Sequence, residues 1–204
     1  MATFIDPADA VLLLVDHQTG LFQTVKDIEL PLLRANVIGL AKAAQLLSVP
    51  VITTASVPEG PNGPLMTEVA TLQGATFVPR NGEVNAWDAP AFAETVKATG
   101  RKTLLIAGVW TSVCVAFPAL AAAAEGYRVY AIIDASGDVS PIAAQVATTR
   151  LAAAGIQVTT SNAVVAEMQK TWNREHAERF GEIYAATTPN YAAVMESFSA
   201  TRQS

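Results

Sequence analysis

Cysteine and histidine are scarce in this sequence, which has one Cys and two His among 204 residues. A single Cys excludes an internal disulfide framework and suits a reducing cytoplasm. The two histidines, His17 and His176, lie too far apart in the sequence to suggest a paired metal site, and we interpret His17 as a packed loop residue. We therefore expect no metal and no other cofactor.

Charged residues are also few. They make up 15% of the chain, the formal net charge is −5, and Lys and Arg form no cluster, so a nucleic-acid partner has little support. The apolar run at residues 10–15 is too short for a signal-peptide core or a membrane span. We expect a cytoplasmic protein without a membrane partner, whose 51% hydrophobic content suits a buried sheet and subunit interfaces.

Short apolar runs alternate with longer segments of helical periodicity along most of the chain. This alternation predicts an α/β fold with a doubly wound, mostly parallel sheet of about six strands and helices on both faces, a Rossmann-like three-layer sandwich. The expected strands are 10–15, 50–55, 75–78, 103–109, 128–134 and 157–161, and the expected helices are 32–47, 64–73, 88–99, 113–126, 140–155 and one that ends near 172.

The length suits one domain over residues 1–204, and no linker or repeat divides it. Residues 173–204 follow the last expected strand and mix charged with aromatic side chains. We predict that they form a packing tail or an oligomer contact and not a second domain.

The only cysteine, Cys114, lies where the strand at 103–109 passes into an Ala-rich helix. Unpaired N–H groups and the positive end of a helix dipole stabilise a thiolate at such a position. A free Cys is equally at home in a core as a small hydrophobic residue. From this stretch alone, a reactive thiol and a structural one are equally well supported.

Two further polar residues follow expected strands. Asp16 comes after the aliphatic run at 10–15, and Arg80 follows the run at 75–78. Taken singly, Asp16 suits a loop cap and Arg80 an exposed surface cation. In doubly wound sheets, ligands bind at the carboxyl ends of the strands near the switch in strand order. The fold therefore predicts that an acid, a cation and the thiol of Cys114 converge on one edge.

The same segments match a known family. VDHQTGLF at 15–22, a basic residue at 80 followed by NAW at 85–87, and GVWTSVCVAFPAL at 108–120 resemble the isochorismatase-like cysteine hydrolases. GPNGP at 60–64, NAWD at 85–88, VCVAFPAL at 113–120 and DASG at 134–137 are similar to the YcaC-like members. The resemblance runs in the same order over nearly the whole chain.

The resemblance implies an enzyme with a catalytic triad of Asp16, Arg80 and Cys114 that hydrolyses a small amide, imide or related carbonyl substrate. Cys114 would form a covalent thioester-type intermediate, and Asp16 would act as general base and then as general acid. Arg80 would keep Asp16 ionised and lower the pKa of the thiol. The resemblance also implies a homo-oligomer, with an octamer as one such assembly.

The family places a non-proline cis peptide four residues before the cysteine, which corresponds to Val109–Trp110. This bond would direct the N–H of Trp110, together with that of Cys114, at the developing oxyanion. The side chain of Trp110 would also line the substrate pocket. The other residues that we expect around the pocket are Gln18, Phe22, Asn85, Trp87, Thr111 and Phe117.

The sequence departs from the family pattern at two positions. Arg80 stands where relatives usually have Lys, and because Arg keeps its proton it can orient Asp16 but cannot shuttle a proton. Ser112 stands where an acid often follows the Thr of the cysteine motif. In addition, the segment in which related nicotinamidases bind a metal reads TTASVPEGPNG here, without His and with Glu59 as its one acid, so a metal and nicotinamidase activity are not expected.

Two other functions are compatible with parts of the sequence. LLLVDHQTG and IIDASGDV faintly resemble motifs of Mg²⁺-dependent haloacid dehalogenase-like phosphatases, but Gln18 stands where their second acid is needed. A non-catalytic oligomeric binding protein that keeps the fold is the other alternative. The sequence does not name the substrate, because loops shape the pocket.

Overall fold

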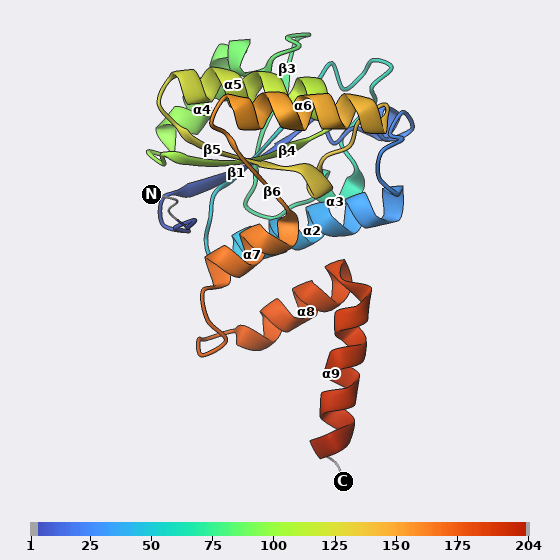
Figure 1. Cartoon of the computed structure of the whole chain (residues 1–204). Coiled ribbons are helices and arrows are strands. Elements are labelled where there is room, and N and C mark those ends of the chain that lie inside the picture. The colour runs from blue at the N-terminus through green and yellow to red at the C-terminus, as the bar shows by residue number, and fades with distance from the viewer. Residues whose placement is uncertain (1–3, 203–204) are drawn as a thin grey trace.

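Two aliphatic strands that are buried at every position form the centre of the sheet. They are β1 (Ala10–Val15) and β4 (Thr103–Gly108). Runs that are apolar on both faces favour a parallel sheet covered by helices on each side. The computed structural model of the chain, which describes residues 4–202, pairs these strands in parallel (Figure 1). Gly108 makes this pairing possible at its end, because a Cβ there would lie 2.5 Å from the Val15 carbonyl oxygen.

All neighbouring strands of the sheet are parallel. From edge to edge the order is β3 (Thr76–Arg80), β2 (Val51–Ser56), β1, β4, β5 (Arg128–Ile132) and β6 (Gln157–Thr159). The chain winds outward from β1 through β2 and β3, and then in the other direction from β4 through β5 and β6. The predicted doubly wound α/β sheet of six strands is confirmed, and its switch point lies between β1 and β4.

Helices cover both faces of the sheet, as Figure 1 shows. Alternate side chains of β1 enter two separate cores, with Leu12 and Leu14 in one and Leu13 in the other. The first core is closed by α2 (Leu30–Leu46) and α7 (Ser161–Gln169), and the second by α4 (Pro90–Ala98), α5 (Ala116–Ala124) and α6 (Pro141–Ala153).

Most expected elements form within a few residues of the predicted bounds, but the expected helix 88–99 starts later. Asn85 accepts the Trp87 N–H at 3.1 Å and so caps a short 3₁₀ turn at Ala86–Asp88. The helix then begins at Pro90, which suits the first helical position. Asp88, the first residue of the expected helix, therefore belongs to the 3₁₀ turn, and Ala89 occupies the position before the helix. The remaining short elements are α1 (Thr19–Phe22), α3 (Thr67–Ala70), a π-helical turn (Thr111–Val115) and a 3₁₀ turn (Ile133–Ala135).

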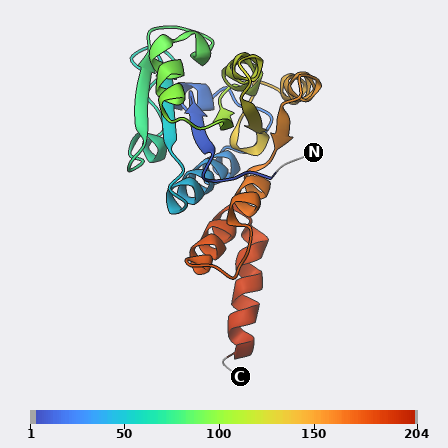
Figure 2. The same ribbon diagram turned by 90° about the vertical axis from the view of Figure 1, so that its left-hand side faces the viewer.

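The C-terminal segment forms two helices, α8 (Ala177–Thr187) and α9 (Pro189–Arg202). Phe180 and Ile183 of α8 are buried in the core that α2 helps to close. Helix α9 packs on α8 and points away from the body of the molecule (Figures 1 and 2). Helix α8 thus packs on α2, and the role of residues 173–204 as a packing or oligomer-contact tail stays a prediction. No helix within residues 4–202 is long and apolar enough to cross a membrane.

Candidate active site

The three polar residues predicted at the strand ends lie together. Asp16 follows β1, Arg80 is the last residue of β3, and Cys114 lies in the π-helical turn after β4. The Arg80 guanidinium forms an ion pair with the Asp16 carboxylate, and that carboxylate is within hydrogen-bonding reach of the Cys114 thiol. Both charged side chains are almost completely buried, and Cys114 is 7% exposed. The structure therefore places an acid, a cation and a thiol in one enclosed site.

The conformation of Asp16 fixes its carboxylate at the end of β1. Its φ is +56°, in the left-handed region. Residues other than glycine are uncommon there, but Asp occurs in this region several times more often than most of them. Its N–H donates to the Thr54 carbonyl at 2.9 Å, and its Oδ1 accepts the Ser56 N–H at 3.0 Å. Because both partners belong to β2, the carboxylate is held between β1 and the neighbouring strand.

Arg80 reaches Asp16 across the whole width of β2. The predicted strand stopped at Val78, but β3 continues through Pro79 to Arg80, and an edge strand tolerates a proline. Arg80 Nε donates to Thr54 Oγ1 at 3.1 Å, and Nη1 donates to the Glu83 carbonyl. The remaining Nη2 donates to Asp16, so every arm of the guanidinium is engaged. The expectation of an exposed surface cation for an isolated Arg80 does not hold here.

The turn that carries Cys114 begins at a cis peptide bond between Val109 and Trp110, as the family resemblance implied. The Trp110 carbonyl accepts the Cys114 N–H at 2.7 Å and the Val115 N–H at 3.2 Å. The Cys114 N–H was expected to point at an oxyanion, but in this structure the turn itself uses it.

The pKa of the Cys114 thiol lies well above its ordinary value. Burial is the largest cause, followed by the negative charge of Asp16 and a hydrogen bond to its carboxylate. The hydrogen bond with the Trp110 backbone and the charge of Arg80 lower the pKa, but by less. The expectation that Arg80 and the helix N-terminus give a net lowering of the thiol pKa was wrong, because desolvation of a thiolate outweighs them. The thiol is therefore protonated at neutral pH, with Asp16 beside it.

Three of the expected pocket residues are buried around this site. Gln18 is fully buried, and its Nε2 donates to the carbonyls of Ser56 and Gly63, so it braces the loop after β2. The Thr111 N–H donates to the Gly137 carbonyl at 2.8 Å. Phe22 is buried 6.2 Å from the His17 ring, measured between centroids. These contacts fix Gln18, Thr111 and Phe22 in the structure, and their roles as pocket walls stay predictions.

The other three expected pocket residues make the following contacts. The Asn85 side chain caps the turn at Trp87. The indole Nε1 of Trp87 donates to Glu125 at 2.7 Å, at the end of α5 remote from Cys114. The Phe117 ring lies 5.8 Å from the guanidinium carbon of Arg150 on α6. These contacts do not test the predicted pocket-wall roles of Asn85, Trp87 and Phe117, which stay predictions.

Sequence reasoning missed two residues that hold the Cys114 turn. Thr24 accepts the indole N–H of Trp110 at 2.6 Å, which fixes the side chain that follows the cis bond. Asp138 accepts the backbone N–H of Ser112 at 2.8 Å and its hydroxyl at 3.1 Å. The only sequence signal was that Asp138 directly follows the DASG motif at 134–137, because contacts across more than 25 residues leave no local pattern.

His17 is fully buried next to Asp16, as a packed residue. Its Nε2 lies 3.0 Å from the Ala135 carbonyl, and its Nδ1 has no partner among the described residues. Burial lowers its pKa from 6.5 to about 4, against the smaller opposing effects of the Ala135 bond and the Asp16 charge. His17 is therefore neutral at pH 7.

The lowered pKa makes His17 a source of acid sensitivity. The unfolded state binds a proton below about pH 6.5 and the folded state only below about pH 4, so stability falls as the pH drops between these values. We expect His17→Gln to reduce the loss of unfolding free energy between pH 7.5 and pH 4.5 by about 2 to 3 kcal/mol. Urea unfolding of the wild type and the variant at pH 7.5 and pH 4.5 measures this loss of unfolding free energy. His176→Gln, at a half-exposed histidine, should leave the loss unchanged. Equal losses in the wild type and the His17 variant would contradict the assignment.

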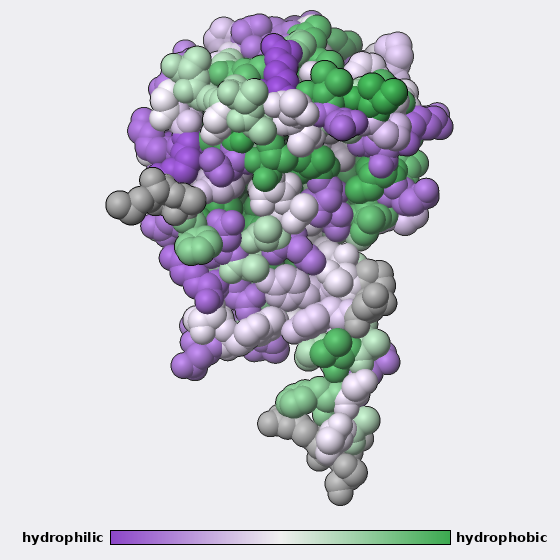
Figure 3. All heavy atoms as spheres, viewed as in Figure 1, coloured by the Kyte–Doolittle hydropathy of each residue, from purple (hydrophilic) through white to green (hydrophobic). Residues whose placement is uncertain are grey.

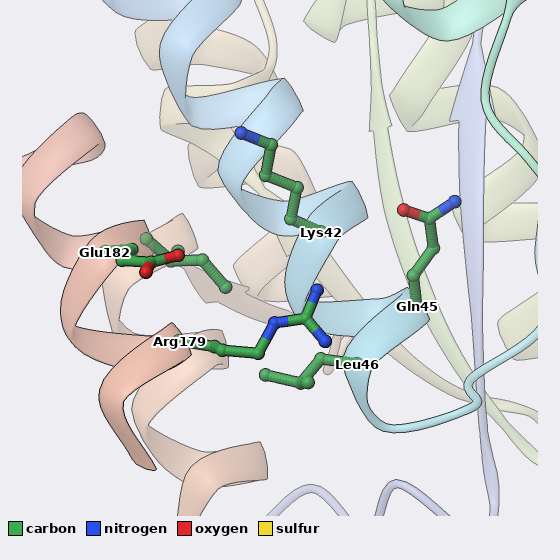
Figure 4. Close-up of a pocket in the computed structure, with 6 residues that line it drawn as sticks. Lys42, Gln45, Leu46, Arg179 and Glu182 are labelled. Atoms are coloured by element: carbon green, nitrogen blue, oxygen red, sulfur yellow. The ribbon is translucent and has the colours of Figure 1, made fainter. Parts of the chain in front are cut away.

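A surface cavity of about 380 Å³ lies between α2 and α8, away from the carboxyl ends of the strands. Lys42, Gln45, Leu46, Arg179 and Glu182 surround it, as Figure 4 shows. These α2 residues precede the start of β2, so the cavity is remote from the carboxyl ends of the strands.

Within residues 4–202, no group of three or more His, Cys, Asp or Glu is placed to hold a metal ion.

Several known proteins are similar to this chain over most of its length. The family model of the isochorismatase domain matches residues 10–163. The chain is 43% identical to the probable hydrolase YcaC of Escherichia coli (strain K12) over 195 residues, which cover 95% of this chain and 93% of that protein.

Two solved structures are similar over 98% of this chain and 98% of their own. YcaC from Pseudomonas aeruginosa, with hexane-2,5-diol and covalent acrylamide, has a TM-score of 0.93 and 41% identity. YcaC from Escherichia coli, described as an octameric hydrolase of unknown specificity, has a TM-score of 0.94 and 40% identity. The chain belongs to the isochorismatase family and is a YcaC-like hydrolase of that family.

Proposed function

We propose that this protein hydrolyses a small amide, imide or related carbonyl compound through a covalent thioester on Cys114. The observation that carries the proposal is the buried Asp16 carboxylate, which is held by Arg80 on one side and contacts the only thiol on the other. A nucleophile, a base within reach and a group that orients the base are the elements of covalent catalysis.

In the first step, the sulfur of Cys114 attacks the substrate carbonyl carbon while its proton passes to Asp16. Since the resting thiol is protonated, its proton must pass to Asp16 before or during the attack. The C–N bond then breaks, the leaving nitrogen takes the proton from Asp16, and the acyl group stays on Cys114. In the second step, Asp16 takes a proton from a water molecule, and the resulting hydroxide forms a C–O bond to the acyl carbon. The C–S bond then breaks, the carboxylic acid leaves, and the proton passes from Asp16 to the sulfur.

Arg80 and the backbone complete the proposed mechanism. Arg80 keeps its proton throughout, so its role is to keep Asp16 ionised and oriented. We assign oxyanion stabilisation to the Trp110 N–H, at the cis bond. The Cys114 N–H can contribute only as a shared donor, because Trp110 O already accepts it.

The relatives and the molecular surface support two further parts of the proposal. A similar protein carries covalent acrylamide, a small amide-bearing electrophile, which is in keeping with a reactive site for small carbonyl compounds. A similar protein is octameric, and α9 of this chain exposes Val194, Met195 and Phe198 (Figure 3). We infer a homo-oligomer, which light scattering at micromolar concentration measures.

Trapping the intermediate tests the proposed function. After acid quenching of a reaction with the activated ester p-nitrophenyl acetate, mass spectrometry should find one acetyl group per chain, on Cys114. Because the chain has one cysteine, Cys114→Ala gives the background from other side chains. Equal acetylation of the native wild type and Cys114→Ala would favour the non-catalytic binding protein instead.

A further inference from the structure

Asp138 is a buried acid to which the proposed reaction gives no role. It follows β5 by a few residues, it is fully buried, and it forms no ion pair with any described residue. A buried carboxylate is costly unless hydrogen-bond donors satisfy it. Its donors are the N–H and the hydroxyl of Ser112, at 2.8 and 3.1 Å, and the N–H of Val139 at 2.8 Å.

The turn that contains Cys114 has no cap of its own. Trp110 occupies the capping position, and its side chain accepts no hydrogen bond from the turn. The first N–H groups of a helical segment need acceptors from outside. The Gly137 carbonyl accepts the Thr111 N–H at 2.8 Å, and the Asp138 carboxylate accepts that of Ser112. Two consecutive residues from the loop after β5 thus cap the turn after β4.

Asp138 is itself fixed to a third strand end. Its N–H donates to Asp27 Oδ1 at 2.6 Å, and its carbonyl accepts the Lys26 N–H at 2.8 Å. The same segment after β1 binds the indole of Trp110 through Thr24. The Cys114 turn is therefore fastened to the loops of two other strands, with Asp138 at the point where all three meet.

We infer that Asp138 is a positioning residue that holds the Cys114 turn and thereby aims the sulfur at the substrate carbonyl, an inference that rests on the proposed function. A carboxylate suits this position because it only accepts hydrogen bonds, and all three of its neighbours are donors. An amide would turn a donor toward another donor. Asp138 acts through Ser112 and does not itself touch the reacting atoms.

Two reagents distinguish the orientation of the Cys114 sulfur toward a carbonyl carbon, called its aim, from the accessibility of the sulfur to any reagent. With p-nitrophenyl acetate, a bond forms between the Cys114 sulfur and the acyl carbon, the C–O bond breaks, and p-nitrophenolate and a proton are released. With iodoacetamide, an S–C bond forms at a methylene carbon, the C–I bond breaks, and iodide and a proton are released. Only the first reaction builds an oxyanion, so the ratio of the acylation rate to the alkylation rate reports aim.

We expect Asp138→Asn to lower this ratio by about 10- to 100-fold, because small misplacements of a reacting group are that costly. The matched control is Asp134→Asn. Asp134 accepts the N–H and the hydroxyl of Ser161 in the same way, but at the start of α7. That variant should keep the ratio within about twofold of the wild-type value, whatever its stability in urea.

Ser112→Ala provides a second variant that removes only the hydroxyl donor, and it decides the question if Asp138→Asn does not fold. It should lower the ratio by about 3- to 10-fold. A ratio that stays within about twofold of that of Asp134→Asn in every folded variant would overturn the role of Asp138. Failure of the native wild type to acylate Cys114 would instead overturn the proposed function.

Discussion

Asp16→Asn should lower hydrolytic turnover by about 10²- to 10⁴-fold and should, at the same time, lower the pKa of the Cys114 thiol. The loss of turnover follows from the loss of the proton acceptor beside the sulfur. Cys114→Ala should cost at least as much, because residues that act as a unit are not additive in their effects. An enzyme with a more easily ionised nucleophile would thus be the slower one.

The direction of the pKa change follows from the charges around the thiol. The negative charge of Asp16 and its hydrogen bond both raise the pKa of Cys114, and the variant removes the charge. The positive charge of Arg80, which lowers the thiol pKa, is then no longer offset by Asp16. Burial still raises the pKa, so the value should fall without reaching that of an exposed reactive thiol.

The rate of alkylation by iodoacetamide as a function of pH measures this change. The midpoint should lie lower in Asp16→Asn than in the wild type, and Asp134→Asn should leave it where it is. Urea unfolding shows whether the variant remains folded with Arg80 unpaired. An unchanged or higher midpoint in a folded variant would show that Asp16 does not act on the thiol.

Much of the fold and the central part of the site follow from local sequence patterns. The run 10–15 has no polar residue on either face, and 103–109 has only Thr103 at its start, a pattern that favours a buried parallel strand between helices. Strand ends in such a sheet share one edge, so Asp16, Arg80 and Cys114 could be placed together. The cis bond at Val109–Trp110 came from the family resemblance alone.

The sequence could not supply quantities that depend on distant neighbours. The direction of the Cys114 pKa depends on how completely the turn excludes water, and local position favoured the opposite direction. The contacts of Trp87 depend on where α5 ends relative to the turn at Ala86–Asp88. The role proposed for Asp138 depends on its contacts with Ser112 and Asp27, which form only when the loops after β1, β4 and β5 come together in the fold.

Arg80→Met should lower the free energy of unfolding by about 3 to 5 kcal/mol, because it leaves the Asp16 carboxylate buried without its partner. Asp16→Asn in the same chain removes that charge, so the double variant should recover part of the loss. Arg34→Met is the matched control, since the Arg34–Glu68 pair is partly exposed and should contribute less than about 1 kcal/mol. Urea unfolding at pH 7.5 gives the free energies of unfolding of the wild type, Arg80→Met, the double variant and Arg34→Met.

Arg80→Lys separates the charge at this position from the shape of the side chain. A lysine restores a cation beside Asp16 but gives up the fork that also binds Thr54 and the Glu83 carbonyl. Its stability should therefore lie between those of the wild type and Arg80→Met, and it should retain turnover, because the proposed role of Arg80 is electrostatic. If Arg80→Met were no less stable than Arg34→Met and kept full turnover, the buried ion pair would not be what holds Asp16 in its working state.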